Sequence, residues 1–129
     1  RWARESPTEA AEWVSKMPEG EARSESMEEV VTQWARKDPT ATAEWLNQFP
    51  SGELMDEPIQ RFVREIARKD PDTALTWAQS ITDEERRKKV EADVMNIKVA
   101  QAQREQAEAS GTPDPQGDRR PRRGPPGSP

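Results

Sequence analysis

The sequence contains no histidine, no cysteine and no tyrosine. Without histidine and cysteine, the common zinc sites, Cys–His pairs and Ser–His–Asp triads cannot be built, and disulfides cannot form. The chain also has no glycine-rich phosphate loop and no cluster of metal-ligating residues. We therefore expect no enzymatic activity, no cofactor and no metal.

Long apolar runs are absent as well, and none approaches the roughly 20 residues that a membrane-spanning helix needs. We expect no membrane span in this chain. No signal peptide is visible, but the chain begins with Arg1 and not with methionine, so we expect a fragment or a processed product. The compartment, cytoplasm or cell envelope, stays open.

Two regions differ sharply in composition. The chain is 31% hydrophobic and 35% charged, with a formal net charge of −5, but residues 111–129 hold half of its twelve prolines and no large apolar side chain. Such a segment cannot bury enough apolar surface to offset the entropy lost on ordering, so we expect a disordered tail. The preceding residues are correspondingly richer in apolar side chains.

A motif recurs every 32 residues along the first part of the chain. It reads "WARESPTEAAEWV" from Trp2, "WARKDPTATAEWL" from Trp34 and "IARKDPDTALTWA" from Ile66. This self-similarity predicts a repeat protein. We divide the chain into the end of a preceding, truncated repeat helix (1–5), repeat 1 (6–37), repeat 2 (38–69), repeat 3 with an extended capping helix (70–110) and the tail (111–129).

Each repeat is expected to form a helical hairpin. Ser6, Asp38 and Asp70 stand immediately before a proline, which is the pattern of a helix N-cap followed by proline in the first turn. Glu9 would complete a capping box with Ser6. A short helix follows each proline, and a longer helix returns to close the hairpin. The spacing of the apolar residues follows the helical period throughout, and no strand is expected.

The tryptophans are expected to form the core between the helices. Trp34 and Trp45 lie on continuous apolar stripes of neighbouring helices, so we expect the two indoles to pack near each other. By the same spacing, Trp2 is expected to pack on Trp13, and the array is expected to continue upstream. The predicted structural core consists of Trp2, Trp13, Trp34, Trp45 and Trp77.

The longer helices of repeats 2 and 3 have features that the longer helix of repeat 1 lacks. Pro58 would break a helix interior, so the second of these helices is expected to start near Asp56, with Pro58 in its first turn. In repeat 3, Thr82 and Glu85 are expected to form a capping box. That helix runs on toward Gly111 with a more polar surface, as a terminal capping helix would. Its basic run at 86–89 is expected to pair with the acidic residues just before it.

The pattern resembles tetratricopeptide-like repeats, in which helical hairpins of about 34 residues end in an alanine-rich turn followed by Asp-Pro. The segments "ARKDP" at 35–39 and 67–71 and "AEW" at 11–13 and 43–45 carry this likeness. It looks closer still to the "WAxxDP…AxW" helical repeats of uncharacterised bacterial proteins. The resemblance covers residues 1–98 and implies an all-α fold, an α-solenoid of antiparallel hairpins. It implies no catalytic residue.

Such a fold suggests a protein-interaction scaffold. Stacked hairpins offer an extended surface lined by the short-helix residues that do not face the core. That surface is mildly acidic at one end and neutral at the other, which favours a basic or polar peptide; ordinary solvated helix faces are the alternative reading. The candidate partner-binding residues are Glu9, Glu12, Lys16, Glu44, Gln48, Thr76 and Ser80.

An alternative function is binding of an anionic surface or nucleic acid by the tail. Four arginines there could neutralise phosphates. The tail has no aromatic side chain for base stacking and the chain is acidic overall, so we favour a protein or peptide partner over nucleic acid. The oligomeric state stays open. The candidate anion-binding residues are Arg119, Arg120, Arg122 and Arg123.

Overall fold

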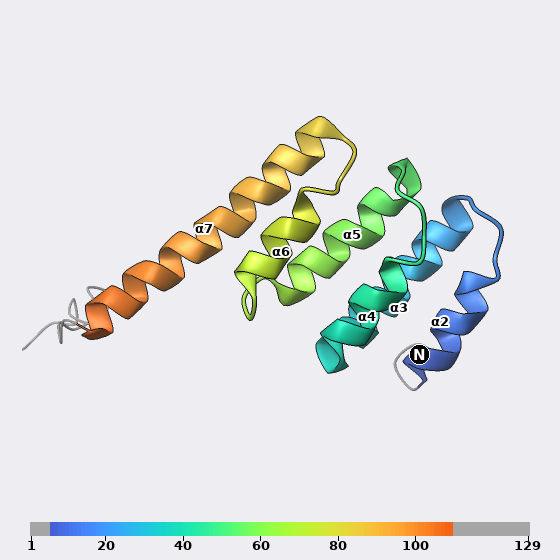
Figure 1. Ribbon diagram of the computed structural model, residues 1–129, viewed down its shortest axis with the longest axis horizontal. Helices are drawn as coiled ribbons and strands as arrows, with labels where there is room; N and C mark the ends of the chain where they lie inside the picture. Colours follow the sequence, from blue (N-terminus) through green and yellow to red (C-terminus); the bar gives the residue numbers. More distant parts are fainter. Residues whose placement is uncertain (1–5, 110–129) are drawn as a thin grey trace, which may run out of the picture. The chain divides into compact units, whose positions relative to one another are not determined.

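The computed structural model describes residues 6–109, which form six α-helices joined by turns (Figure 1). No strand occurs among these residues, so the all-α prediction is confirmed. The helices are α2 (Pro7–Ser15), α3 (Glu21–Lys37), α4 (Pro39–Leu46), α5 (Glu53–Ile66), α6 (Pro71–Ala78) and α7 (Glu84–Ala109).

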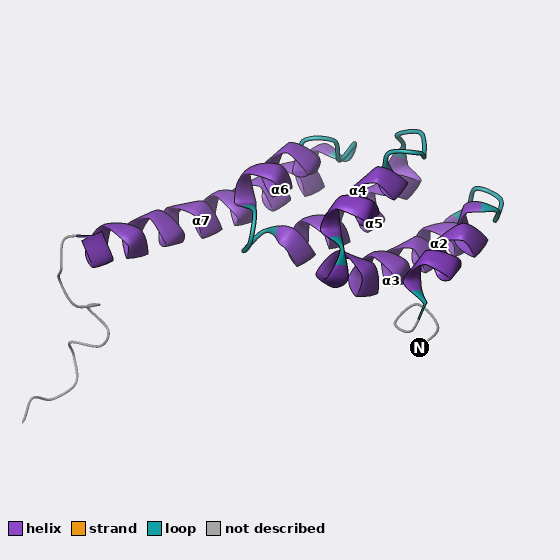
Figure 2. Cartoon of the chain, turned by 60° about the horizontal axis from the view of Figure 1, so that its bottom comes forward, coloured by secondary structure: helices purple, strands orange, loops and turns teal. Residues whose placement is uncertain are grey.

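Short and long helices alternate within the first of two units, residues 1–97; the second unit begins at Lys98 and contains the rest of α7. In the first unit α3 packs against α5. The short helices are attached to these two long ones, with α2 and α4 against α3 and α6 against α5. The turns α2–α3, α4–α5 and α6–α7 lie on one side of this unit (Figure 2).

Asp38 and Asp70 are confirmed as N-caps of α4 and α6. The carboxylate of Asp38 accepts from the Ala41 N–H at 3.0 Å, and that of Asp70 accepts from the Thr73 N–H at 3.2 Å. The predicted capping box at α2 is wrong, because the Ser6 side chain makes no capping hydrogen bond. A carboxylate is a stronger acceptor than a hydroxyl and is favoured by the helix dipole, which neutral Ser6 is not.

The predicted start of α5 is also wrong. The helix begins at Glu53 and contains Pro58 in its interior. Proline has no N–H, so it leaves the carbonyl of Leu54, four residues earlier, without its usual helical donor. The hydroxyl of Ser24, on α3, donates to this carbonyl at 2.8 Å. A hydroxyl from the neighbouring helix α3 thus replaces the backbone donor that the Leu54 carbonyl loses because of the proline.

The start of α7 differs from the predicted capping box. The Asp83 carboxylate caps the helix by accepting from the Arg86 N–H at 2.8 Å. Thr82 does not cap the helix and bonds instead to the buried carboxylate of Asp56, on α5. Asp56 accepts from the Thr82 N–H and hydroxyl, both at 2.8 Å, and from the Asp83 N–H at 3.1 Å. A buried charge needs several donors, and this turn provides three.

The tryptophans have unequal environments. Trp45 is only 5% exposed, and its ring lies 6.0 Å from that of Trp34, which confirms the predicted packing of these two indoles. Trp34 and Trp77 are partly buried against the core. Trp13 is 57% exposed, so its assignment to the buried core is wrong. Trp2 and its predicted contact lie outside the described residues.

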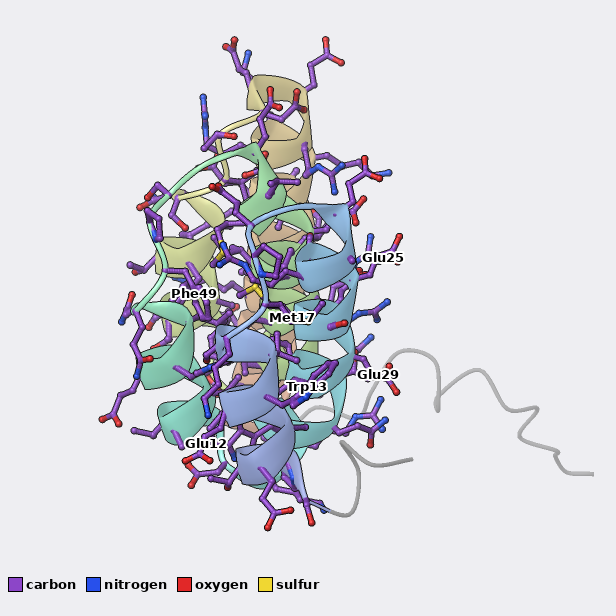
Figure 3. The ribbon with its side chains drawn as sticks, turned by 90° about the vertical axis from the view of Figure 1, so that its right-hand side faces the viewer. Glu12, Trp13, Met17, Glu25, Glu29 and Phe49 are labelled. Carbon is purple, nitrogen blue, oxygen red and sulfur yellow. The ribbon has the colours of Figure 1, made fainter. Side chains whose placement is uncertain are left out.

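Trp13 lies at the edge of the buried side of α2, which consists of Ala10, Ala11 and Val14. Trp45 and Trp77 each pack on the long helix that precedes their own short helix, through Trp34 and Phe62 respectively. Figure 3 shows the Trp13 side chain on the near surface of the first hairpin.

Candidate functional site: the groove between α4 and α6

Two cavities lie between the short helices α4 and α6, one toward the start of both helices and one toward their ends. We call them together the α4–α6 groove. The first has a volume of about 480 Å³, and the second about 310 Å³. Figure 1 shows α5 between α4 and α6, and residues of α5 line both cavities.

The floor comes from one face of α5. Met55 and Ile59 line the second cavity, and Phe62 and Ile66 line the first. Their spacing of four, three and four residues places them along a single side of the helix. The floor is therefore an apolar stripe. At a rise of 1.5 Å per residue it runs for about 16 Å, which matches about five residues of an extended segment.

The walls combine apolar side chains with uncharged polar ones. The polar ones are Thr40 on α4, Asn47 just after α4, and Thr73 and Thr76 on α6; the apolar ones include Pro39, Ala43, Leu46 and Trp77. The Thr76 hydroxyl is already used, since it donates to the Asp72 carbonyl at 3.2 Å. Walls of this kind can bond the backbone of a bound segment while the floor receives apolar side chains. Polar groups that bond the backbone, together with an apolar surface that receives side chains, are typical of sites that bind peptides.

The two walls are fixed by the same local device. Asp38 caps α4 and Asp70 caps α6, and in both helices proline takes the first position. Each wall helix therefore starts at a defined point beside the end of a long helix. Asp70 also lines the first cavity.

Charged side chains stand at the first cavity. The Arg36 Nε donates to Glu65 Oε1 at 2.9 Å, joining the end of α3 to α5. This hydrogen bond raises the pKa of the Arg36 guanidinium above its ordinary value, so the group stays cationic. Lys69 and Asp70 also line this cavity. Both signs of charge are present, so this end can pair with either sign on a bound segment.

The groove does not coincide with the predicted partner-binding row. All seven predicted residues are exposed in the structure, which leaves them available. Only Thr76 and Ser80 line the groove. The structure does not bring the other five to the two cavities; they are Glu9, Glu12, Lys16, Glu44 and Gln48. The four predicted anion-binding arginines, at 119, 120, 122 and 123, lie outside the described residues.

Sequence reasoning missed the floor of the groove. Phe62 and Ile59 fall on one apolar side of α5 by their spacing, but an apolar stripe does not show whether the neighbouring helices cover it. A signal that could have helped is the pair Ser15 and Asn47, which are 32 residues apart. Ser15 accepts from Trp45 Nε1 at 2.8 Å and so ties α4 to α2, whereas Asn47 and Trp77 line the second cavity.

Two buried polar residues were missed as well. Ser24 and Asp56 occupy matching positions of α3 and α5, 32 residues apart, and each bonds to residues at or before the start of the next long helix. Their signal was a polar residue three positions before the apolar Met27 or Ile59, on the buried side of the helix. Their role is structural, because each links one long helix to the next.

A smaller polar cavity of about 280 Å³ lies on the other side of the long helices. Arg61, Arg64 and Arg86 line it together with Glu28 and Glu57. The carboxylates offset the charge of the guanidinium groups, and Arg86 donates to Gln60 Oε1 at 2.6 Å. We regard this cavity as a solvated, charge-paired face.

The predicted charge pairing at the start of α7 is confirmed for one residue of the basic run, since Lys88 pairs with Glu84 at 3.3 Å.

Within residues 6–109 no group of acidic side chains is arranged to hold a metal ion. None of the helices in this range combines the length and the apolar character required to cross a bilayer. Comparisons of the chain with models of protein families, with curated proteins and with solved structures found no match.

Proposed function

We propose that this chain is a non-catalytic protein-interaction scaffold, in which helical hairpins with a 32-residue period stack as a tetratricopeptide-like α-solenoid. The α4–α6 groove is its binding site, and the ligand is a segment of a partner protein. The observation that carries the proposal is the combination of an apolar floor on α5 with uncharged hydroxyl and amide side chains in the walls at α4 and α6.

The chemistry of the groove describes the ligand. Apolar side chains of the partner fit over Ile59 and Phe62, and the partner's backbone meets the hydroxyl and amide groups of the walls. The first cavity has no excess of one charge, because Arg36 and Lys69 line it together with Glu65 and Asp70. A segment with two or three apolar side chains is therefore a better match than the basic peptide favoured by the exposed row of short-helix residues.

The experiment uses a displayed library of random peptides, selected on the full chain and then measured by fluorescence. Trp77 lines the second cavity, so a bound peptide should change the tryptophan emission. Selected peptides are then tested against Thr73→Tyr combined with Thr76→Tyr. Both residues are exposed and line the groove, and the larger rings fill it from the α6 wall. We expect at least a tenfold loss of affinity, about 1.4 kcal/mol.

The matched control reverses charge on the exposed row, with Glu12→Lys combined with Glu44→Lys. Neither residue lines the groove, so affinity should hold within a factor of two. If the control loses the peptides and the groove variant keeps them, the site is the exposed row and the groove assignment is refuted. If no peptide is selected by the chain at all, the proposed scaffold role loses its support.

A further inference from the structure

The tryptophans of α4 and α6 differ in what their indole N–H groups bond. Trp45 Nε1 donates to the hydroxyl of Ser15, on α2, at 2.8 Å. Trp77 stands 32 residues later, and its ring lies 5.2 Å from that of Phe62. Among the residues that the structure describes, none accepts a hydrogen bond from Trp77 Nε1. The indole donor that is paired in α4 is therefore unpaired in α6.

The unpaired Trp77 donor remains in contact with solvent. Within residues 6–109, no fully buried side-chain nitrogen or oxygen lacks a partner, so Trp77 Nε1 is not fully buried. The Trp77 side chain lines the second cavity of the α4–α6 groove. A ligand that displaces water from this N–H without supplying an acceptor leaves the donor unsatisfied, which lowers its affinity. A well-matched ligand therefore carries an acceptor beside Trp77.

A second polar group of this cavity is also unpaired. Asn47 stands 32 residues after Ser15, and its amide makes no hydrogen bond to any other described side chain or backbone group. That amide offers both a donor and an acceptor. The hydroxyls of Thr76 and Ser80, which line the same cavity, already donate to backbone carbonyls of α6. The second cavity thus presents an indole donor and an amide to a ligand.

These unpaired groups match an extended backbone better than a helical one. A helix uses most of its backbone N–H and carbonyl groups in internal hydrogen bonds. An extended segment leaves both kinds of group free, so its carbonyls can accept from Trp77 and its N–H groups can donate to the Asn47 amide. Alternate side chains of such a segment point to the same side, where they can meet the apolar floor.

We propose that Trp77 fixes the register of an extended partner segment in the groove, by donating its Nε1–H to a backbone carbonyl of that segment. The carbonyl takes the role that the Ser15 hydroxyl has between α2 and α4. Because the acceptor belongs to the backbone, this contact selects an extended conformation and not a particular side chain. The inference rests on the proposed function, since it assigns one contact within the same groove.

The first test follows the indole N–H signals of the full chain by proton–nitrogen correlation NMR. Trp45→Phe and Trp77→Phe identify the two signals by their loss. In the free chain, the Trp77 N–H should exchange with water roughly tenfold faster than the buried, hydrogen-bonded Trp45 N–H. Peptides selected on the chain should move the Trp77 signal and slow its exchange. Equal protection of the two N–H groups in the free chain would overturn the proposal.

The second test measures the affinity of the selected peptides by calorimetry. Trp77→Phe keeps an aromatic ring beside Phe62 and removes the donor, so binding should weaken about fivefold. Trp13→Phe is the matched control, since it makes the same change at a residue that lines neither cavity. Its affinity should hold within about a factor of two. Circular dichroism verifies that both variants retain their helices.

The third test changes the peptide and leaves the protein intact. Replacing a backbone amide by an ester weakens the carbonyl as an acceptor, and each linkage is replaced in turn. At one linkage the ester should weaken binding to the natural chain about threefold and have no such effect on Trp77→Phe.

The outcomes separate the Trp77 contact from the groove itself. If Trp77→Phe and all esters keep full affinity while the Thr73→Tyr and Thr76→Tyr combination loses it, the groove binds peptides without this contact, and only the present inference is refuted. If the groove-filling variant also keeps the peptides, or if none is selected, the proposed function fails as well.

Discussion

Two junctions between neighbouring short helices, α2 with α4 and α4 with α6, have matching sequences but different structures. A hydrogen bond joins the helices at the first junction, and two cavities lie between them at the second. At the first, Trp45 is buried against Trp34 and donates through Nε1 to Ser15 at 2.8 Å. At the second, Trp77 packs on Phe62 and stays partly exposed, with cavities on either side of the Phe62–Trp77 pair. The junction with the Trp45–Ser15 hydrogen bond is thus the one in which the tryptophan is buried, and the junction with the two cavities has Asn47 at the position that matches Ser15.

The largest expected difference between the junctions comes from removing each tryptophan. Trp45→Ala should lower the free energy of unfolding by about 4 kcal/mol, because it empties a buried site and removes a hydrogen bond. Trp77→Ala should cost about 2 kcal/mol, since part of that ring is already in water. Urea unfolding followed by circular dichroism measures both. Equal losses would mean that the second junction is as closed as the first.

Another tie lies near the start of α5, where Asp56 accepts hydrogen bonds from the α6–α7 turn. Asp56→Ala should lower the free energy of unfolding by about 3 kcal/mol, because the Thr82 and Asp83 donors lose their buried acceptor. Asp93→Ala, at an exposed position of α7, is the matched control and should change stability by less than about 0.5 kcal/mol. If both substitutions have the same small effect, Asp56 does not hold the α6–α7 turn.

A smaller effect separates Ser15 from Asn47, its counterpart 32 residues later. Ser15→Ala should cost about 1 kcal/mol, since the Trp45 Nε1–H is left without its acceptor. Asn47→Ala should be nearly neutral, because Asn47 is exposed beside the groove. Thermal unfolding of the two variants gives the comparison. A larger loss for Asn47 would place an unrecognised tie at the second junction.

The smallest expected difference concerns the caps of the two walls. Asp38→Ala and Asp70→Ala should each cost about 1 kcal/mol, because each carboxylate accepts one backbone N–H at the start of its helix. The two costs should agree within about 0.3 kcal/mol, as the caps are alike although the junctions differ. Denaturant midpoints of the two variants test this. Clearly unequal costs would show that the cap is coupled to the state of the groove.

The sequence predicted two of the helix caps and the packing of Trp34 on Trp45, but it predicted neither the Ser6 cap nor the groove. Asp38 and Asp70 were recognised as caps because all the atoms involved lie within four residues. The burial of Trp13 was mispredicted because an apolar position does not reveal whether a neighbour covers it. The groove was missed for a similar reason: the helical period identifies an apolar face but not the distance between two helices.

Pro58 imposes a rule on which residues can replace Ser24. As long as proline stands at position 58, the Leu54 carbonyl needs a donor from α3, and only a side chain as short as serine or threonine brings a hydroxyl to that point. Once position 58 regains an N–H, position 24 is released and alanine becomes acceptable there. The two positions should therefore change together during evolution, and a designer who removes the proline first gains freedom at a residue 34 positions away.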